Sequence, residues 1–278
     1  MPEGPEIRLA ADKIAKVLVD KPIESFFFGL PDLARWEEEF VSSYVISIET
    51  RGKALLTHFA NGLTIYSHNQ LYGRWDVVKR NRLPSTGRSL RMAIHTVEHS
   101  VLLYSASDIS VWETRRLLEH PFLAKLGPDI LSDKLTWRQV ASLLVSLKFR
   151  NRGVGAFYLD QGFVAGIGNY LRSEILFFAK VNPWAKPNQL STKELNQLAR
   201  ATLDVSRRSY KTKGVTNEAI RVNQLKKLGQ TRSQFRHAVF GRESQACYDC
   251  GSDIIKDSVA SRRLYWCPAC QYETSEKL

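Results

Sequence analysis

The feature that most restricts the fold of this chain is the arrangement of its cysteines. All four fall into two C-x2-C pairs that sixteen residues separate, namely Cys247, Cys250, Cys267 and Cys270. Each C-x2-C turn directs two thiolates to one side, and two such turns complete a tetrahedron around zinc. Two disulfides are the structural alternative, but an intracellular chain with no other cysteine rarely forms them. The spacing therefore predicts one structural zinc ion, because four cysteine ligands leave the metal no open position.

The segment between the two cysteine pairs is expected to form a β-hairpin. Residues 254–255 and 264–266 supply its strands, and residues 261–263 lie near its tip. A ribbon that a metal holds rigid and that presents Arg262 and Arg263 suits a phosphate contact. An exposed basic turn without a ligand is the alternative.

The residue pattern of the remaining chain changes near residue 121, from one typical of strands to one typical of helices. The part before this point predicts one helix followed by strands, because β-branched and aromatic runs alternate with turn residues. The middle third predicts helices, and the last third predicts short strands around the cysteines. The expected strands cover residues 44–52, 54–68 and 100–107, and the expected helices cover residues 137–147, 154–161, 169–180 and 192–210.

A hairpin turn is expected at Asn61-Gly62, the strongest short signal for a type I′ turn. A two-residue turn pairs Ala60 with Leu63. The same register places Lys53 across from Gln70.

The net charge of +12 is unevenly distributed. Residues 1–130 carry 16 basic and 16 acidic side chains, so the whole excess lies in the second half. Between residues 206 and 242 there are ten basic residues and one acid, Glu218. A basic half joined to a neutral half indicates a polyanionic partner, usually nucleic acid. A basic surface that only keeps the protein soluble is the alternative.

The chain shows no sign of a membrane segment or a signal peptide. No apolar run approaches the roughly 18 residues that span a bilayer. The N-terminus contains Glu3 and Glu6 and has no hydrophobic stretch behind a basic region. We therefore expect a soluble, intracellular protein.

Residues 166–170, Gly-Ile-Gly-Asn-Tyr, precede a helical run. Glycines let the backbone approach a ligand, and the free N–H groups of a first helical turn form a natural phosphate site. Asn169 is expected to cap that turn, and Arg172 is expected to add charge to it. An ordinary glycine turn between packed helices is the alternative.

The chain begins Met-Pro-Glu-Gly-Pro-Glu. Pro5 suits the first helical turn because its missing N–H needs no partner there. Glu6 favours the positive end of the helix dipole. A helix start therefore explains Pro5 and Glu6, but it leaves Pro2 and Glu3 unexplained.

Taken together, five stretches resemble the formamidopyrimidine-DNA glycosylase and endonuclease VIII family of base-excision enzymes. They are PEGPE at the start, ETRGKALL, YSHNQLYG, GIGNYLRSEIL and the ribbon that ends SRRLYWCPAC. The resemblance covers essentially the whole chain. It implies an α+β fold: an N-terminal helix with a two-sheet β-sandwich (residues 1–124), a helix–two-turn–helix domain (125–222), and a C-terminal region (223–278) with a zinc ribbon at about 240–272.

The resemblance also implies the catalytic residues. Met1 is removed, and Pro2 becomes the nucleophile that attacks C1′ of the sugar. Glu3 is the general acid and base, and Glu6 lies near enough to assist, although its dipole role explains it equally well. Lys53 matches the lysine that contacts the phosphate beside the lesion. An α-amine suits nucleophilic attack because its reference pKa is about 8, against about 10.4 for lysine.

The residues that the resemblance assigns to DNA binding fall into two groups. Asn169 and Arg262 match residues that grip the phosphates beside the flipped nucleotide, and Arg263 is the competing match. Gln70, Leu71 and Tyr72 match the loop that fills the gap left in the stack when a base is flipped out. Without the resemblance, core packing explains Leu71 and Tyr72 better.

The implied activity is that of a bifunctional DNA glycosylase and abasic-site lyase. It removes oxidised pyrimidines and then cleaves the strand by β,δ-elimination. The partner is duplex DNA with an oxidised base or an abasic site, the cofactor is one zinc ion with no redox or organic cofactor, and the protein is a cytoplasmic, bacterial monomer. The alternatives are an oxidised-purine glycosylase of the same family, a non-catalytic protein that binds damaged DNA, and a ribosome-associated zinc-ribbon protein, which explains the charge but not the N-terminus.

Overall fold

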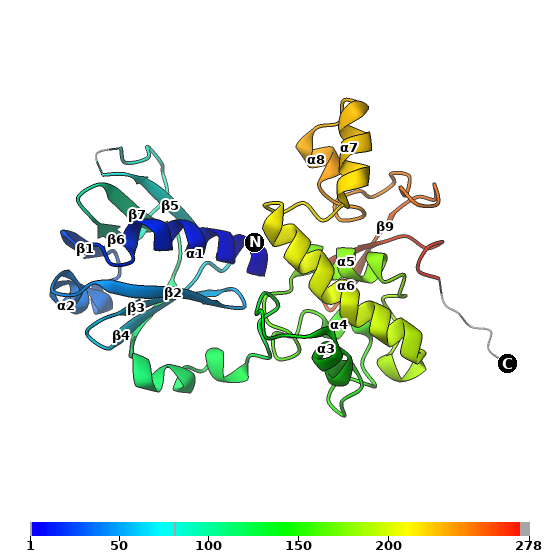
Figure 1. The fold of residues 1–278 in the computed structure, drawn as a ribbon, viewed down its shortest axis with the longest axis horizontal. Helices are drawn as coiled ribbons and strands as arrows, with labels where there is room; N and C mark the ends of the chain where they lie inside the picture. Colours follow the sequence, from blue (N-terminus) through cyan, green and yellow to red (C-terminus); the bar gives the residue numbers. More distant parts are fainter. Residues whose placement is uncertain (1, 81, 273–278) are drawn as a thin grey trace. The chain divides into compact units, whose positions relative to one another are not determined.

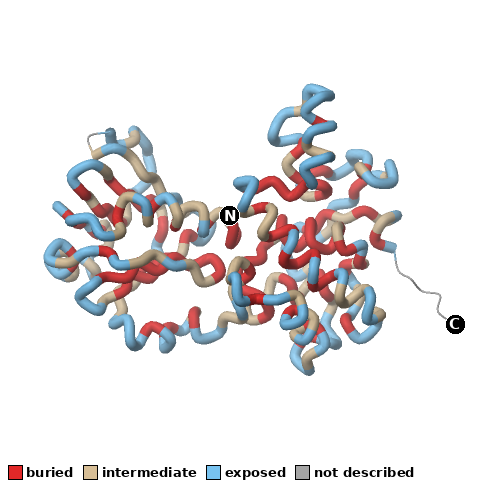
Figure 2. The backbone as a smooth tube through the Cα atoms, viewed as in Figure 1, coloured by how far each residue is buried: buried red, intermediate tan, exposed pale blue. Residues whose placement is uncertain are grey.

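The computed structural model divides the chain into two compact units, Met1–Lys125 and Leu126–Leu278 (Figure 1). It describes residues 2–80 and 82–272. None of the described helices is both long and apolar enough to cross a membrane. Each unit has its own buried interior, which Figure 2 shows in red.

The first unit contains a long helix and two four-stranded antiparallel sheets. The sheets have the strand orders β1-β6-β7-β5 and β2-β3-β4-β8. The elements are α1 (Gly4–Leu18), β1 (Ser25–Phe28), η1 (Pro31–Trp36), α2 (Glu37–Val41), β2 (Val45–Arg51), β3 (Ala54–Phe59), β4 (Leu63–His68), β5 (Arg74–Lys79), β6 (Leu90–His95), β7 (His99–Tyr104), β8 (Asp108–Glu113), η2 (Thr114–Glu119) and η3 (Leu123–Lys125).

One hydrophobic core joins α1 to both sheets. The apolar face of α1 recurs at helical spacing, and its members are at most 2% exposed: Ile7, Ala11, Ile14 and Leu18. They pack with side chains from both sheets and with a group of phenylalanine rings in mutual contact, Phe26, Phe28, Phe40 and Phe59. Burial of each large apolar side chain stabilises the fold by about 1.5–3 kcal/mol. The core therefore holds the start of α1 firmly in place.

The second unit is helical and ends in a two-stranded ribbon. Its elements are α3 (Trp137–Leu144), α4 (Val154–Phe157), α5 (Asn169–Phe178), η4 (Pro187–Gln189), α6 (Thr192–Lys211), α7 (Ala219–Lys227), α8 (Arg232–Phe235), β9 (Ile255–Val259) and β10 (Arg262–Trp266). Ser191 caps α6, and the Glu194 carboxylate accepts hydrogen bonds from the backbone and hydroxyl of Ser191 at 2.8 and 2.6 Å. The expected capping pattern of this helix is confirmed.

The predicted fold class is confirmed, with several local differences. The helix expected over 154–161 is a single turn, because Asp160 accepts a hydrogen bond from the Gly162 N–H at 2.9 Å and closes a turn. The ribbon turns at Ala260 and Ser261, both at positive φ, so Arg262 and Arg263 lie in β10. Helices α7 and α8 lie where the sequence predicted only short strands. The domain boundary at residue 222 stays a prediction.

The β3–β4 hairpin has a different register from the predicted one. Ala54 pairs with His68, whereas a two-residue turn would pair it with Asn69. Three residues form the turn, and Gly62 adopts a φ of 79° and donates a hydrogen bond to the Phe59 oxygen at 3.2 Å. A three-residue turn with a left-handed glycine is the next most common hairpin connection. The prediction that Lys53 lies directly across from Gln70 is therefore wrong by one residue.

Candidate functional site

The N-terminal residues lie at the start of α1. Glu3 is only 3% exposed, and Pro2 is half-buried. The Glu6 carboxylate accepts a hydrogen bond from the Glu3 N–H at 3.0 Å. Glu6 thus fixes the backbone of Glu3 and complements the helix dipole. Met1, which the sequence analysis expects to be removed, lies outside the described residues.

Lys53 lies between β2 and β3, directly after Gly52, which has a φ of 63°. The lysine is 7% exposed, which is unusual for this residue type. The charge of Lys53 acts on His68, at the end of β4. Burial lowers the pKa of His68, the carboxylate of Asp108 raises it, and the positive charge of Lys53 lowers it further. Because Ala54, the residue after Lys53, pairs with His68, Lys53 and His68 lie near the same end of the sheet.

His68 is not among the site residues predicted from the sequence. The available signal was its place in YSHNQLYG, two residues before Gln70. Its Nδ1 accepts a hydrogen bond from the Gln70 N–H at 3.0 Å. The histidine thereby holds the start of the loop that follows β4.

That loop, residues 69–73, is here called the wedge loop. Gln70 has a φ of 50°, and its side-chain oxygen accepts a hydrogen bond from the Ser107 hydroxyl at 3.0 Å. Leu71 is 57% exposed and Tyr72 is 71% exposed. Because apolar side chains of this size are rarely held so far into solvent side by side, the loop suits insertion between stacked bases.

In the second unit, residues 166–168 form the turn that precedes α5. Gly166 has a φ of 106°, and its N–H donates to the Gln161 side-chain oxygen at 3.0 Å. Gly168 occupies the N-cap position, and Asn169 is the first residue of the helix. Asn169 therefore does not cap α5 as the sequence predicted; its half-exposed side chain stays a predicted phosphate ligand.

Arg172 differs most from its expected role. It is 0% exposed, so it cannot add charge to a phosphate site. Its guanidinium donates to the Gly155 oxygen at 2.7 Å and to carbonyl oxygens of the ribbon, at 3.2 Å for Arg262 and 3.0 Å for Arg263. A third ribbon oxygen, that of Val259, accepts at 3.3 Å. Arg172 thus anchors the ribbon tip to α5 through backbone carbonyl groups.

We expect Arg172→Leu to destabilise the protein by about 3 kcal/mol or more, because the buried carbonyl groups lose their donors. The free energy of unfolding in urea measures this loss. DNA affinity should fall with it, since Arg262 and Arg263 lose their fixed backbone. Arg115→Leu is the control, because that side chain is 83% exposed. Unchanged stability of Arg172→Leu would show that the anchor is dispensable.

Glu174 is a second buried charge that the sequence analysis missed. It is 0% exposed, and its carboxylate accepts backbone hydrogen bonds from Ala238 at 2.8 Å, Val239 at 2.8 Å and Phe240 at 2.9 Å. The Thr216 hydroxyl also donates to it. This carboxylate ties α5 to the segment that enters the ribbon, which no local pattern indicates.

The four cysteines gather at the base of the ribbon. All four sulfur atoms lie within 4.8 Å of one another, and Cys247–Cys270 and Cys250–Cys267 are separated by 3.9 and 3.4 Å. These distances exceed a disulfide bond of about 2.05 Å. They fit the sulfur separation of about 3.8 Å that tetrahedral ligation with 2.3 Å bonds requires. The cluster can therefore bind a metal ion.

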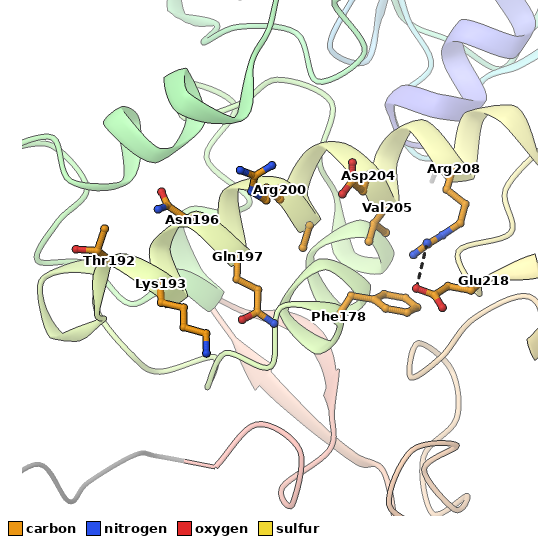
Figure 3. A pocket seen from close by; sticks show the side chains of 11 residues that line it. Phe178, Thr192, Lys193, Asn196, Gln197, Arg200, Asp204, Val205, Arg208 and Glu218 are labelled. Atoms are coloured by element: carbon orange, nitrogen blue, oxygen red, sulfur yellow. Dashed lines mark ion pairs between the residues drawn. The ribbon is translucent and has the colours of Figure 1, made fainter.

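Two hollows lie along α6. One of about 700 Å³ is lined by Lys193, Arg200 and Arg208 together with Phe178, and Arg208 pairs with Glu218 at 3.7 Å (Figure 3). The other, of about 660 Å³, is strongly basic, and its charged lining residues are Asp204, Arg207, Arg208, Lys211, Lys226 and Arg232. Neither hollow contains a residue that the sequence analysis predicted for the site. Much of the basic excess of the second half is thus gathered on this helix and its neighbours.

Family models match two long segments of the chain, and full-length relatives cover 98% of it. Residues 1–117 match the formamidopyrimidine-DNA glycosylase N-terminal domain, and residues 126–220 match the formamidopyrimidine-DNA glycosylase H2TH domain. Proteins named Endonuclease 8 from Salmonella arizonae and from an Escherichia coli strain are each 46% identical, over 98% of this chain and 100% of theirs.

Solved structures share the fold. One is the Lactococcus lactis formamidopyrimidine DNA glycosylase bound non-covalently to DNA with an abasic site, with a TM-score of 0.79 and 20% identity. Another is the same enzyme with DNA that contains N7-benzyl-Fapy-dG, with a TM-score of 0.80 and 21% identity. Both alignments cover 98% of this chain and 100% of the other.

Proposed function

The chain belongs to the formamidopyrimidine-DNA glycosylase family, and from this membership we propose that it excises oxidised pyrimidines from DNA and cleaves the strand at the resulting site. Its enzymatic class is DNA glycosylase and abasic-site lyase. One observation supports the chemistry above all others. Glu3, whose carboxylate is buried, directly follows the half-buried Pro2 in the chain, at the start of α1.

Pro2 is the nucleophile in this proposal. Its nitrogen forms a bond to C1′ of the sugar as the bond from C1′ to the base breaks. The nitrogen then loses its proton, the C1′–O4′ bond breaks with proton uptake by O4′, and the secondary amine is left as an iminium ion whose fixed positive charge makes the C2′ proton acidic. Loss of this proton expels the 3′ phosphate, and a second elimination expels the 5′ phosphate.

Glu3 and Lys53 assist this reaction. Glu3 passes protons to and from the sugar as the ring opens and the strand breaks. Lys53 pairs with the phosphate beside the lesion, and its near-complete burial strengthens such a charge pair. Glu6 holds the Glu3 backbone through their 3.0 Å hydrogen bond, so we assign it a positioning role.

Both units contribute DNA contacts. Gln70, Leu71 and Tyr72 fill the gap in the stack, and the exposure of the last two supports this role. Asn169 and Arg262 bind phosphates near the flipped nucleotide, with Arg263 beside them on the ribbon. The two arginines are exposed in β10, where Arg172 fixes the backbone of both.

We assign zinc to the four-cysteine cluster, because tetrahedral thiolate ligation is typical of this metal. The ion would be structural and would hold the base of the ribbon. We place the enzyme in the bacterial cytoplasm as a monomer, in keeping with its bacterial relatives.

Chelation of the metal is expected to abolish DNA binding before the first unit unfolds. The ribbon loses its anchor at the cysteines, whereas the core around α1 contains no metal ligand. Gel-shift titration measures DNA binding, and hydrogen–deuterium exchange of the strand amides of the first unit follows its unfolding. Normal DNA binding by the chelated protein would contradict the role that we give to the ribbon.

Base preference is the test of the proposed substrate. Matched duplexes with thymine glycol or 8-oxoguanine are incubated with the protein, and base release and strand cleavage are measured. We expect faster release of thymine glycol, as for an enzyme of pyrimidine lesions. Faster release of 8-oxoguanine would assign the chain to purine lesions instead. Failure to release either base would contradict the enzymatic proposal.

A further inference from the structure

The side chain of Asn69 closes the wedge loop. Its amide Nδ2 donates a hydrogen bond to the backbone oxygen of Gly73 at 3.0 Å, and the Gly73 N–H donates one to the backbone oxygen of Asn69 at 2.7 Å. The two ends of the loop are therefore joined by a pair of hydrogen bonds. Leu71 and Tyr72 lie between these ends and extend into solvent.

Asn69 faces inward, unlike the residues that follow it. It is only 6% exposed, and its Oδ1 is buried without a hydrogen-bond partner among the described residues. The orientation of the amide follows from its partner, because a carbonyl oxygen such as that of Gly73 can only accept. An asparagine that is buried and bound to its own loop fixes the shape of that loop.

Gly73 makes the close approach possible. A Cβ atom at this position would lie 2.5 Å from the Asn69 oxygen and 2.6 Å from its Cα atom. Both are backbone atoms, so no side chain can move aside. The sequence Asn-x-x-x-Gly thus closes the loop from both ends.

We propose that Asn69 is a positioning residue for filling the stack: its closure of the wedge loop presents Leu71 and Tyr72 in one geometry before DNA binds. The inference rests on the proposed function, in which these two side chains replace the flipped base. A preformed loop loses little conformational freedom on binding. Placement matters, because small displacements near a reacting centre can lower rates about 100-fold.

Two substitutions open the loop from opposite ends. Asn69→Asp places a carboxylate against the Gly73 oxygen, where two acceptors repel each other, and Gly73→Ala adds the clashing Cβ. The matched controls are Asn61→Asp and Gly87→Ala. Asn61 donates to the Glu39 oxygen at 2.9 Å in a different turn, and a Cβ on Gly87 meets open space.

The measurement compares single-turnover cleavage at an abasic site in duplex DNA and in the same single strand. A single strand has no stack to fill, so the ratio of duplex to single-strand rates isolates the wedge loop. We expect both loop variants to lower this ratio by roughly 10-fold to 100-fold. The fluorescence of 2-aminopurine opposite the abasic site should also change less on binding. The two controls should keep the wild-type ratio.

The outcomes distinguish failure of the role given to Asn69 from failure of the proposed enzymatic function. Equal losses on both DNA forms, or an unchanged ratio in folded variants, would overturn the role of Asn69. If the aspartate variant fails to fold, Asn69→Ser removes the same hydrogen bond without adding a charge. We expect it to lower the ratio of duplex to single-strand rates by the same factor. A wild-type protein without activity on either DNA would refute the proposed function itself.

Discussion

Borohydride reduction is expected to trap the protein covalently on duplex DNA that contains an abasic site, with the adduct at Pro2. The iminium ion between Pro2 and C1′ is the species that the reagent reduces to a stable amine. Insertion of one alanine between Met1 and Pro2 displaces the reactive amine. We expect the trapped yield and the cleavage rate to fall more than about 1000-fold, as when other covalent nucleophiles are removed.

Peptide mapping of the adduct by mass spectrometry identifies the attacking residue. DNA affinity of the extended protein serves as the control, since the ribbon and the wedge loop are unchanged. An adduct that maps to Lys53 or to another lysine would refute the role of Pro2. So would full activity of the extended protein in which N-terminal sequencing finds the inserted alanine ahead of Pro2.

Glu3→Gln is expected to lower the rate of base release by about 100-fold to 10,000-fold, the usual contribution of a general acid or base. The amide keeps the size of the buried side chain, so folding should change little. It cannot transfer a proton, however, and the limb of the pH–rate profile that belongs to Glu3 should disappear. Single-turnover rates across the pH range measure both effects.

Glu98→Gln is the matched control for this prediction. The Glu98 side chain is 82% exposed in the β6–β7 turn, and the same change of charge there should leave the rate unaltered. Equal effects of the two substitutions would show that only net charge matters. An unchanged pH–rate profile of the Glu3→Gln protein would show that Glu3 does not transfer a proton in the reaction.

Most features that were predicted correctly from the sequence depend on short-range patterns of residues. The cysteine spacing, the helix start at the N-terminus and the capping of α6 depend on residues a few positions apart, and their local geometry leaves few alternatives. The hairpin at Gly62 was placed correctly but shifted by one residue, because two-residue and three-residue turns share the same Asn-Gly signal. The short helices α7 and α8 lacked a strong periodic pattern.

Long-range contacts decided the rest. Arg172 and Glu174 look like charged surface residues of a helix, yet both are 0% exposed. Most of their partners are backbone groups about 60 to 90 positions later in the chain, including the N–H of Ala238 and the oxygen of Arg263. A backbone group has no sequence signature, so no pattern could have revealed these pairs.

By itself, the sequence determined the candidate chemistry: a proline amine and a carboxylate at the start of a helix, and four thiols at metal-binding spacing. The four thiols follow from residue identity and spacing, whereas the roles of Pro2 and Glu3 follow from the resemblance of the sequence to a known family. Only the tertiary structure decided which charges face solvent, where Lys53 lies relative to His68, and how Asn69 closes the wedge loop. The physical reason is that burial and hydrogen-bond geometry depend on packing between segments that are distant in the chain or joined by turns of variable length.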